Sequence, residues 1–135
     1  MPSLTVSFLP LQGPIIELGI AFPRQPQTMR KYRALVDTGA FRTSISPAVV
    51  ADLGLPRHAS GLTDPIGTAK GPAEAEIYVA EITVLFPGSP PFVIVQNVYD
   101  FTPLPGASFE VLLGLDIICA GKLTINGDQM TLELP

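Results

Sequence analysis

The chain carries, at residues 32–40, the stretch Tyr32-Arg33-Ala34-Leu35-Val36-Asp37-Thr38-Gly39-Ala40. An apolar run leads directly into one carboxylate, and a hydroxyl and two small residues follow it. Because an unpaired charge is costly inside a buried strand, we expect Asp37 where a strand turns into a loop. Gly39 permits backbone angles and close approaches that a side chain would forbid. The pattern indicates either a turn-forming aspartate or an acid placed for chemistry.

Two motifs in a fixed order make the pattern more specific. The segment 34–40, followed by Thr43-Ser44-Ile45-Ser46, resembles the active-site loop of retropepsin-like aspartic proteases. The segment Val111-Leu-Leu-Gly-Leu-Asp-Ile-Ile118 resembles the second signature of that family, in which apolar residues and a glycine precede a short helix. The resemblance spans nearly the whole chain. It implies an all-β fold, a closed retropepsin-like (acid protease) β-barrel with one or two short helices, formed by residues 1–135 as a single domain.

Composition fits one globular domain. The chain has 135 residues, of which 47% are hydrophobic, and its 15 prolines and 12 glycines predict many turns. Only 15% of the residues are charged, which suggests that apolar surface is buried or shared with a partner. The net charge is −4 and there is no basic stripe, so we expect no nucleic-acid partner.

Cysteine and histidine are too few for a metal site or a disulfide. Cys119 is the one cysteine and His58 the one histidine, so we expect no intrachain disulfide, no metal and no cofactor. No run approaches the roughly 18 apolar residues of a membrane helix, and the N-terminus lacks a basic region followed by a long apolar segment. The sequence therefore predicts a soluble, cytoplasmic protein without a membrane partner.

Local patterns predict the secondary structure. Ser46 suits a helix N-cap, Pro47 the first helical position and Gly54 the residue after the helix. Residues 92–99 are expected to form a strand buried on both faces. Asn126-Gly127 predicts a hairpin turn. The full set of expected strands is 4–8, 15–22, 31–36, 43–46, 62–67, 75–84, 92–99, 110–113, 122–125 and 130–134.

Two further features concern the neighbourhood of the motifs. Residues 61–84 predict a long hairpin with its tip at 68–72, which the resemblance implies is the flap that closes over substrate; an ordinary surface hairpin is the alternative. Asp116 is expected to be the N-cap of a short helix over residues 117–120.

One Asp-Thr-Gly implies two chains. Hydrolysis without a metal or a nucleophile needs two carboxyl groups that share one proton. The internal candidates for a second carboxylate lack a following Thr-Gly or Ser-Gly; they are Asp52, Asp64, Asp100, Asp116 and Asp128. A twofold dimer would bring the two Asp37 side chains together. We therefore predict a homodimeric aspartic endopeptidase acting on a peptide or protein substrate. The alternative is a dimeric binding module that kept the fold without proteolysis.

The resemblance also assigns roles to individual residues. It implies that Asp37, Thr38 and Gly39 are catalytic, with Thr38 hydrogen-bonded across the dimer axis and Gly39 binding substrate backbone. Phe41 and Arg42 stand where viral enzymes usually carry acidic residues, and Leu115 replaces an arginine common among them. The substrate-binding positions that it implies are Ala40, Phe41, Ile66, Gly67, Thr68, Ala69, Lys70, Gly71, Phe109, Glu110 and Leu112.

Overall fold

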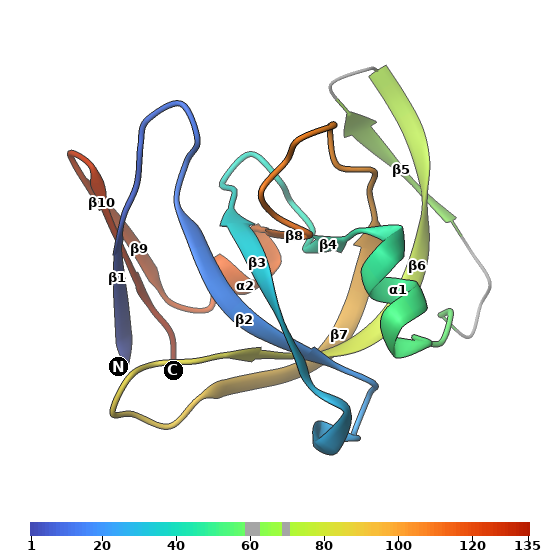
Figure 1. The fold of residues 1–135 in the computed structure, drawn as a ribbon, viewed down its shortest axis with the longest axis horizontal. Coiled ribbons are helices and arrows are strands. Elements are labelled where there is room, and N and C mark those ends of the chain that lie inside the picture. Colours follow the sequence, from blue (N-terminus) through green and yellow to red (C-terminus); the bar gives the residue numbers. More distant parts are fainter. Residues whose placement is uncertain (59–62, 69–70) are drawn as a thin grey trace.

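A six-stranded β-barrel forms the body of the molecule. The computed structural model describes residues 1–58, 63–68 and 71–135. Around the barrel the strands follow the order β2-β3-β8-β4-β7-β6, and pairing of β2 with β6 closes it (Figure 1). The predicted all-β barrel with two short helices is confirmed. The strands are β2 (Ile15–Ala21), β3 (Arg30–Val36), β4 (Ser44–Ile45), β6 (Gly71–Val84), β7 (Phe92–Asp100) and β8 (Val111–Leu113).

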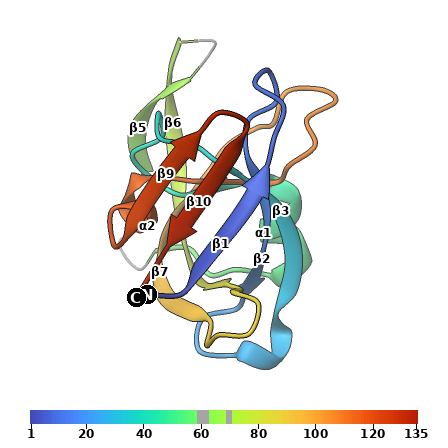
Figure 2. The same cartoon turned by 90° about the vertical axis from the view of Figure 1, so that its left-hand side faces the viewer.

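A second, three-stranded sheet carries both chain ends. It is antiparallel, with β10 (Gln129–Glu133) between β1 (Ser3–Ser7) and β9 (Lys122–Asn126), and the two termini lie side by side (Figure 2). Asn126 pairs with Gln129, so the turn is formed by Gly127 and Asp128, one residue later than predicted. Gly127 has a φ of 63°, which glycine adopts without strain.

The barrel core follows the alternation of its strands. Parallel pairing of β3 with β8 sets Ala34 opposite Val111 and Val36 opposite Leu113, and all four side chains are buried. Leu35 lies between them in sequence and points to the other face of the sheet, as the period of two requires. The face of β3 and β8 away from the core is therefore the face on which a site can be built.

One burial prediction is wrong. Along β7 the side chains alternate, and Val93 and Val95 are 52% and 39% exposed, although both faces were expected to be buried. The reason is that β7 is a barrel strand next to β6, with one face toward the core and the other outward. Strands buried on both faces belong to sheets covered on both sides.

Helix α1 (Pro47–Leu53) confirms the capping signals. The Ser46 hydroxyl accepts a hydrogen bond from the Val49 amide at 3.4 Å, and Pro47 opens the helix. Gly54 ends it with a φ of 60°. A 3₁₀ turn at Pro26–Thr28, which was not predicted, links β2 to β3.

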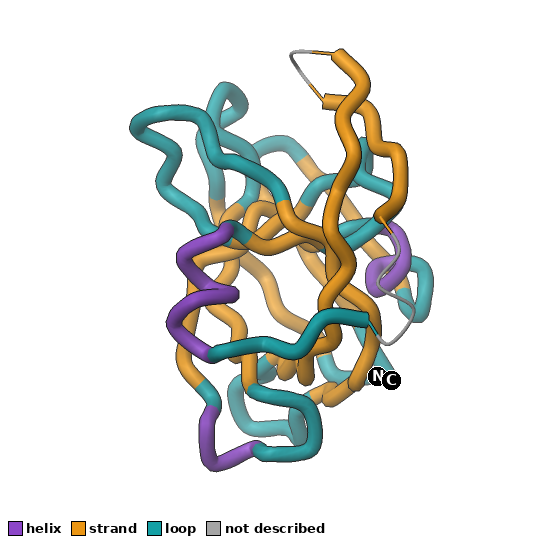
Figure 3. The backbone as a smooth tube through the Cα atoms, turned by 90° about the vertical axis from the view of Figure 1, so that its right-hand side faces the viewer, coloured by secondary structure: helices purple, strands orange, loops and turns teal. Residues whose placement is uncertain are grey.

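A long hairpin projects from the barrel. It is formed by β5 (Thr63–Thr68) and the first part of β6, which continues without a break into the barrel wall (Figure 3). Thr68 pairs with Gly71 and Gly67 with Pro72, so the tip is shorter than the predicted 68–72. No helix in the described part of the chain is long and apolar enough to span a membrane.

Candidate active site

The backbone of β8 fixes Asp37 at the end of β3. The Asp37 amide donates to the Leu113 carbonyl at 3.0 Å, which extends the parallel ladder by one residue. The carboxylate Oδ1 accepts the Gly39 amide at 2.8 Å, and the Asp37 carbonyl accepts the Ala40 amide at 3.2 Å. Among the described residues no donor is bonded to Oδ2. The half-buried carboxylate is thus oriented by its own turn and keeps one oxygen available.

Gly39 lies close against the Asp37 carboxylate. A Cβ at Gly39 would lie 3.1 Å from Oδ1 of Asp37, which is tighter than an ordinary van der Waals contact. Its backbone is outside the left-handed region, so close approach and not φ is what calls for glycine here. The side chain of Thr38, between them, is exposed.

Backbone hydrogen bonds and close backbone contacts join the second motif to the loop of the first. At the start of α2 (Leu115–Ile118), the Leu115 amide donates to the Ala40 carbonyl at 2.8 Å and the Asp116 amide to the Phe41 carbonyl at 3.2 Å. A Cβ at Gly114 would lie 2.6 Å from the carbonyl carbon of Arg42 and 2.9 Å from the Ala40 oxygen. Only glycine fits between these backbones, so the resemblance in both motifs reflects one interlocked structure.

The predicted role of Asp116 is wrong. Gly114 is the N-cap of α2, and the Asp116 side chain bonds instead to Thr43, at the far end of the loop that contains Asp37. Thr43 donates to Asp116 from its amide, at 3.0 and 2.9 Å to the two oxygens, and from its hydroxyl at 2.7 Å. The local sequence favours Asp116 as a helix cap, but its carboxylate binds the donors of Thr43, 73 residues away in the chain.

A small apolar surface continues from Asp37 along the outer face of β3 and β8. Leu112 is half-buried there. It pairs with Leu35 in the parallel β3–β8 ladder and with Ser44 in the antiparallel β4–β8 ladder. Leu35 packs over the backbone of Gly13, where an added Cβ would meet Leu35 Cδ1 at 2.9 Å. Leu35 was not predicted as a site residue. Its position two residues before Asp37 was the available signal, because alternate strand residues share a face.

Phe109 and Glu110 lie just before β8 and are engaged with other side chains. The ring of Phe109 stacks on Phe101, with centroids 6.3 Å apart and planes inclined by 19°. The Glu110 carboxylate accepts the hydroxyl of Ser46 at the start of α1. The Glu110 backbone is fixed as well, because its amide donates to the Arg33 carbonyl at 3.0 Å.

The two residues after Ala40 point in different ways. The Phe41 side chain is 79% exposed. The Arg42 guanidinium lies over the ring of Tyr99, 5.5 Å from its centroid, a cation–π contact. Arg42 is therefore stacked on the barrel wall, whereas Phe41 presents an apolar ring to its surroundings.

The predicted flap residues fall on the projecting hairpin. Ile66, Gly67, Thr68 and Gly71 are in the β5–β6 ladder, and Ala69 and Lys70 lie outside the described residues. Figure 1 places this hairpin at the same end of the barrel as the loop after β3.

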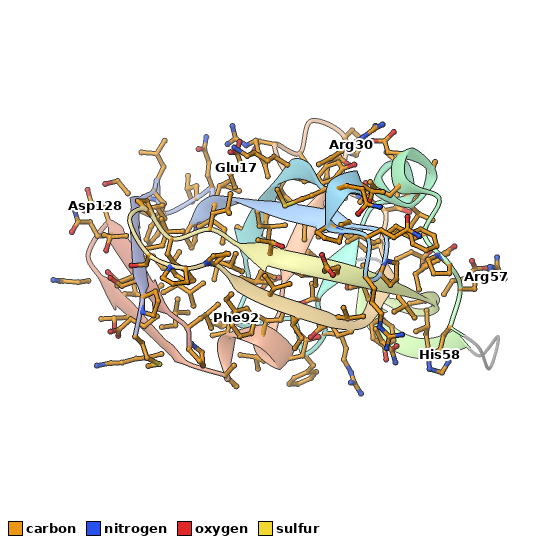
Figure 4. All side chains as sticks on the ribbon, turned by 90° about the horizontal axis from the view of Figure 1, so that it is seen from below. Glu17, Arg30, Arg57, His58, Phe92 and Asp128 are labelled. Carbon is orange, nitrogen blue, oxygen red and sulfur yellow. The ribbon has the colours of Figure 1, made fainter. Side chains whose placement is uncertain are left out.

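Polar contacts hold the base of the hairpin. The Glu76 amide donates to Asp100 Oδ1 at 2.8 Å, which ties β6 to the end of β7. The Glu76 carboxylate accepts Arg57 and the Tyr78 hydroxyl, both at 2.7 Å. Arg57 and His58 lie at the end of the molecule opposite to Asp128 (Figure 4). Burial, with the Glu76 hydrogen bond, raises the pKa of Tyr78.

No metal centre is apparent among the described residues, since they include no cluster of three His, Cys, Asp or Glu side chains suited to hold an ion. The carboxylates of Asp100 and Asp116 already accept backbone amides, and Asp52 accepts the hydroxyl of Tyr32 at 3.3 Å.

Comparison with known proteins supports both the motifs and the fold. A sequence family described as aspartyl protease matches residues 29–117. Among solved structures, the chain is similar to the crystal structure of a retropepsin-like aspartic protease from Rickettsia conorii, with a TM-score of 0.64 and 16% sequence identity. That likeness covers 98% of this chain and 90% of the other. A search of curated proteins finds no match.

Proposed function

The chain belongs to the aspartyl protease family, and from that premise we propose that it is a homodimeric aspartic endopeptidase whose catalytic pair is formed by Asp37 of each subunit. The observation that carries the proposal is the state of the Asp37 carboxylate. One of its oxygens is held by the Gly39 amide, and the other has no bonded donor among the described residues. An oriented acid with a free oxygen is what shared-proton chemistry needs.

The contacts of the other carboxylates support the proposal of a second chain, although the side chain of Asp64 lies outside the described residues. Asp100 and Asp116 accept backbone amides from Glu76 and Thr43, and Asp52 accepts a tyrosine hydroxyl. Asp128 lies in the turn between β9 and β10, within the other sheet. A twofold axis beside Asp37 supplies the missing partner without any of them.

In the proposed reaction, one Asp37 carboxylate takes a proton from a water molecule as that water attacks the peptide carbonyl, while the carboxylic acid of the other Asp37 gives its proton to the carbonyl oxygen. When the C–N bond of the resulting diol breaks, the first Asp37 passes its proton to the leaving nitrogen and a diol hydroxyl returns a proton to the second, so the pair again holds one proton. Two carboxyl groups about 3 Å apart do not both ionise, because their negative charges would repel each other. The Asp37 pair therefore holds one proton between the subunits. Thr38, which is exposed in the single chain, is free to bond across the axis, and Gly39 to bind substrate backbone.

Exposed apolar side chains at the same end support self-association. Leu9 and Leu11 on the β1–β2 loop, Phe41 beside Asp37, and Leu104 between β7 and β8 are all exposed. Isolated exposed apolar residues are ordinary, but these lie on loops at one end of the barrel, the end that carries the turn after β3 (Figure 1), where a subunit contact would cover them. In the terminal sheet β10 is central and β1 and β9 are the outer strands, so the outer edges of β1 and β9 are candidates for pairing with a second chain.

Substrate binding is assigned to both sides of Asp37. The β5–β6 hairpin acts as the flap, with residues 66–71 above the substrate, and Ala40 and Phe41 flank the catalytic turn. Leu112, with Leu35 beside it in register, provides an apolar wall, so apolar side chains next to the cleaved bond are favoured. Phe109 and Glu110 border the same wall.

Mixed dimers test the shared site directly. Asp37→Asn is nearly isosteric, so the fold and the dimer should persist while hydrolysis is lost. When equal amounts of wild-type and mutant chains are unfolded and refolded together, about one quarter of the dimers are fully wild-type. Activity should fall to that fraction of an equal total amount of wild-type dimer.

A residual activity near one half would contradict the shared site, because it is the value expected if each chain holds a complete one. Asp128→Asn, the same chemical change in a remote turn, is the matched control and should keep full activity in the mixture. A wild-type dimer that binds peptides without cleaving them would instead support the alternative, a binding module with the same fold.

A further inference from the structure

We propose that Asp116 is a positioning residue for the Asp37 loop, acting through Thr43. Its effect on catalysis rests on the proposed function, whereas its effect on the loop does not. The loop runs from Asp37 to Thr43, and residues 113–116 hold both of its ends. The Leu113 carbonyl accepts the Asp37 amide at 3.0 Å, and the Asp116 carboxylate accepts both donors of Thr43.

A short relay of hydrogen bonds joins the two ends of the loop. The Gly114 amide donates to the Thr43 hydroxyl oxygen at 3.1 Å, and that hydroxyl donates to Asp116 Oδ1 at 2.7 Å. The carboxylate thereby fixes the direction of the hydroxyl, which leaves its oxygen free to accept Gly114. Because Gly114 directly follows Leu113, the peptide that holds Asp37 is also held from the far end of the loop.

A carboxylate suits this place better than any neutral side chain. Thr43 is fully buried and offers two donors, and the Gln96 amide nitrogen offers a third to Oδ2 at 3.0 Å. An ionised carboxylate accepts at every lone pair and donates nothing, so it satisfies all three. Asparagine would turn one accepting oxygen into a donor, and alanine would remove the protein acceptor of the Thr43 amide and hydroxyl.

The bond from Gln96 extends the arrangement to the barrel wall. Gln96 is on β7, so Asp116 joins α2, the Asp37 loop and β7 at one point. The Tyr99 amide, also on β7, donates to the Thr43 carbonyl at 3.1 Å. The Thr43 carbonyl is therefore bonded to β7, whereas its amide and hydroxyl are bonded to Asp116 in the second motif.

Amide hydrogen exchange tests the proposal without any need for activity. In Asp116→Ala, the Thr43 amide loses its acceptor directly, whereas the Asp37 amide keeps its own. If Asp116 positions the loop, exchange at Asp37 should nevertheless speed up, by roughly ten- to a hundredfold, the factor expected for losing a charge-assisted hydrogen bond that holds the loop closed. The amides of β2 and β6 serve as the internal reference.

Three variants sharpen the result. Thr43→Val removes the hydroxyl and should reproduce the faster exchange at Asp37, whereas Thr43→Ser keeps the hydroxyl and should restore the slow rate. Asp128→Ala is the control for removing a carboxylate elsewhere. Faster exchange at Thr43 alone, or equal acceleration throughout β2 and β6, would overturn the proposal, because the first is a local loss and the second a general destabilisation.

Kinetics then separate positioning from binding. Asp116→Ala should lower kcat by at least about tenfold with KM changed by less than about twofold, since the acid is displaced while the apolar wall remains. An unchanged kcat with the expected exchange would refute the catalytic part alone. A wild-type dimer without activity would refute the proposed function, and the exchange result would still decide whether Asp116 positions the loop.

Discussion

Replacing Gly114 by alanine would force apart the two motifs that form the candidate site. The new Cβ would lie 2.6 Å from the Arg42 carbonyl carbon, 2.7 Å from its oxygen and 2.9 Å from the Ala40 oxygen. These separations fall roughly 0.6–0.9 Å short of an ordinary contact of about 3.5 Å. Relief on that scale stretches the 2.8 Å bond from the Leu115 amide to the Ala40 carbonyl beyond hydrogen-bonding range.

The expected cost of Gly114→Ala combines three effects. Overpacking costs about 1–3 kcal/mol. Loss of one hydrogen bond adds about 0.5–1.5 kcal/mol. Reduced freedom of the unfolded chain returns about 0.4–1 kcal/mol. The free energy of unfolding should therefore drop by about 0.5–4 kcal/mol in urea titrations. A displacement of the Asp37 loop approaching 1 Å should lower kcat about a hundredfold.

Two glycine controls distinguish a steric clash from backbone strain, and a clash at the candidate site from one elsewhere. Gly121→Ala would overlap the Glu133 carbonyl in the terminal sheet, so it should destabilise the fold while a dimer that still forms keeps its kcat. Gly88 has a φ of 74° and open space around it, so Gly88→Ala should cost only about 1 kcal/mol through its backbone. The reasoning fails if Gly114→Ala unfolds at the wild-type urea concentration, or if its kcat falls no further than that of Gly121→Ala.

Three further changes have defined outcomes. Ser46→Ala removes the cap of α1 and the donor to Glu110, and should cost about 1–2 kcal/mol in urea unfolding; a loss below about 0.3 kcal/mol would contradict it. Burial and Asp52 raise the pKa of Tyr32, so the folded state holds its proton more tightly, and this stability is present below about pH 10 and lost as pH rises through the raised value. Tyr32→Phe should therefore flatten the alkaline fall in stability measured between about pH 8 and 11, and an identical slope would be evidence against it. Phe41→Ser should leave monomer stability within about 0.5 kcal/mol, because the ring is exposed, yet weaken the dimer in sedimentation equilibrium; unchanged association would remove Phe41 from the subunit contact.

Elements with local signals were predictable from the sequence. Helix α1 has its serine cap, its first-turn proline and its terminal glycine within nine consecutive residues, 46–54, and each does what its chemistry favours. The turn before β10 was predicted at Asn126-Gly127 and lies one residue later, at Gly127-Asp128. Asp37 and Gly114 were singled out because the two motifs that contain them resemble those of retropepsin-like proteases.

Contacts between distant segments were not predictable in the same way. The acceptor of the Thr43 hydroxyl is 73 residues away, and nothing near Asp116 in sequence distinguishes a helix cap from a bond to another loop. The exposed face of β7 was missed because a run of apolar residues predicts burial, whereas closure of the barrel decides which face is covered. The alternation of strand residues could have indicated that Leu35 shares a face with Asp37, but its pairing with Leu112 is set only by the parallel β3–β8 ladder.

Asp37 and Asp116 show how similar local sequence leads to different roles. Each lies two residues from a glycine and close to apolar residues, but Asp37 begins a loop whereas Asp116 lies within helix α2. The Asp116 carboxylate receives three donors from Thr43 and Gln96, so its oxygens are committed to structure. The Asp37 carboxylate receives only the Gly39 amide from within its own turn, and among the described residues its second oxygen stays open. Because an oxygen without a bonded donor is the one better placed to act on water, we assign the proposed chemistry to Asp37 and propose that Asp116 holds the loop that presents it.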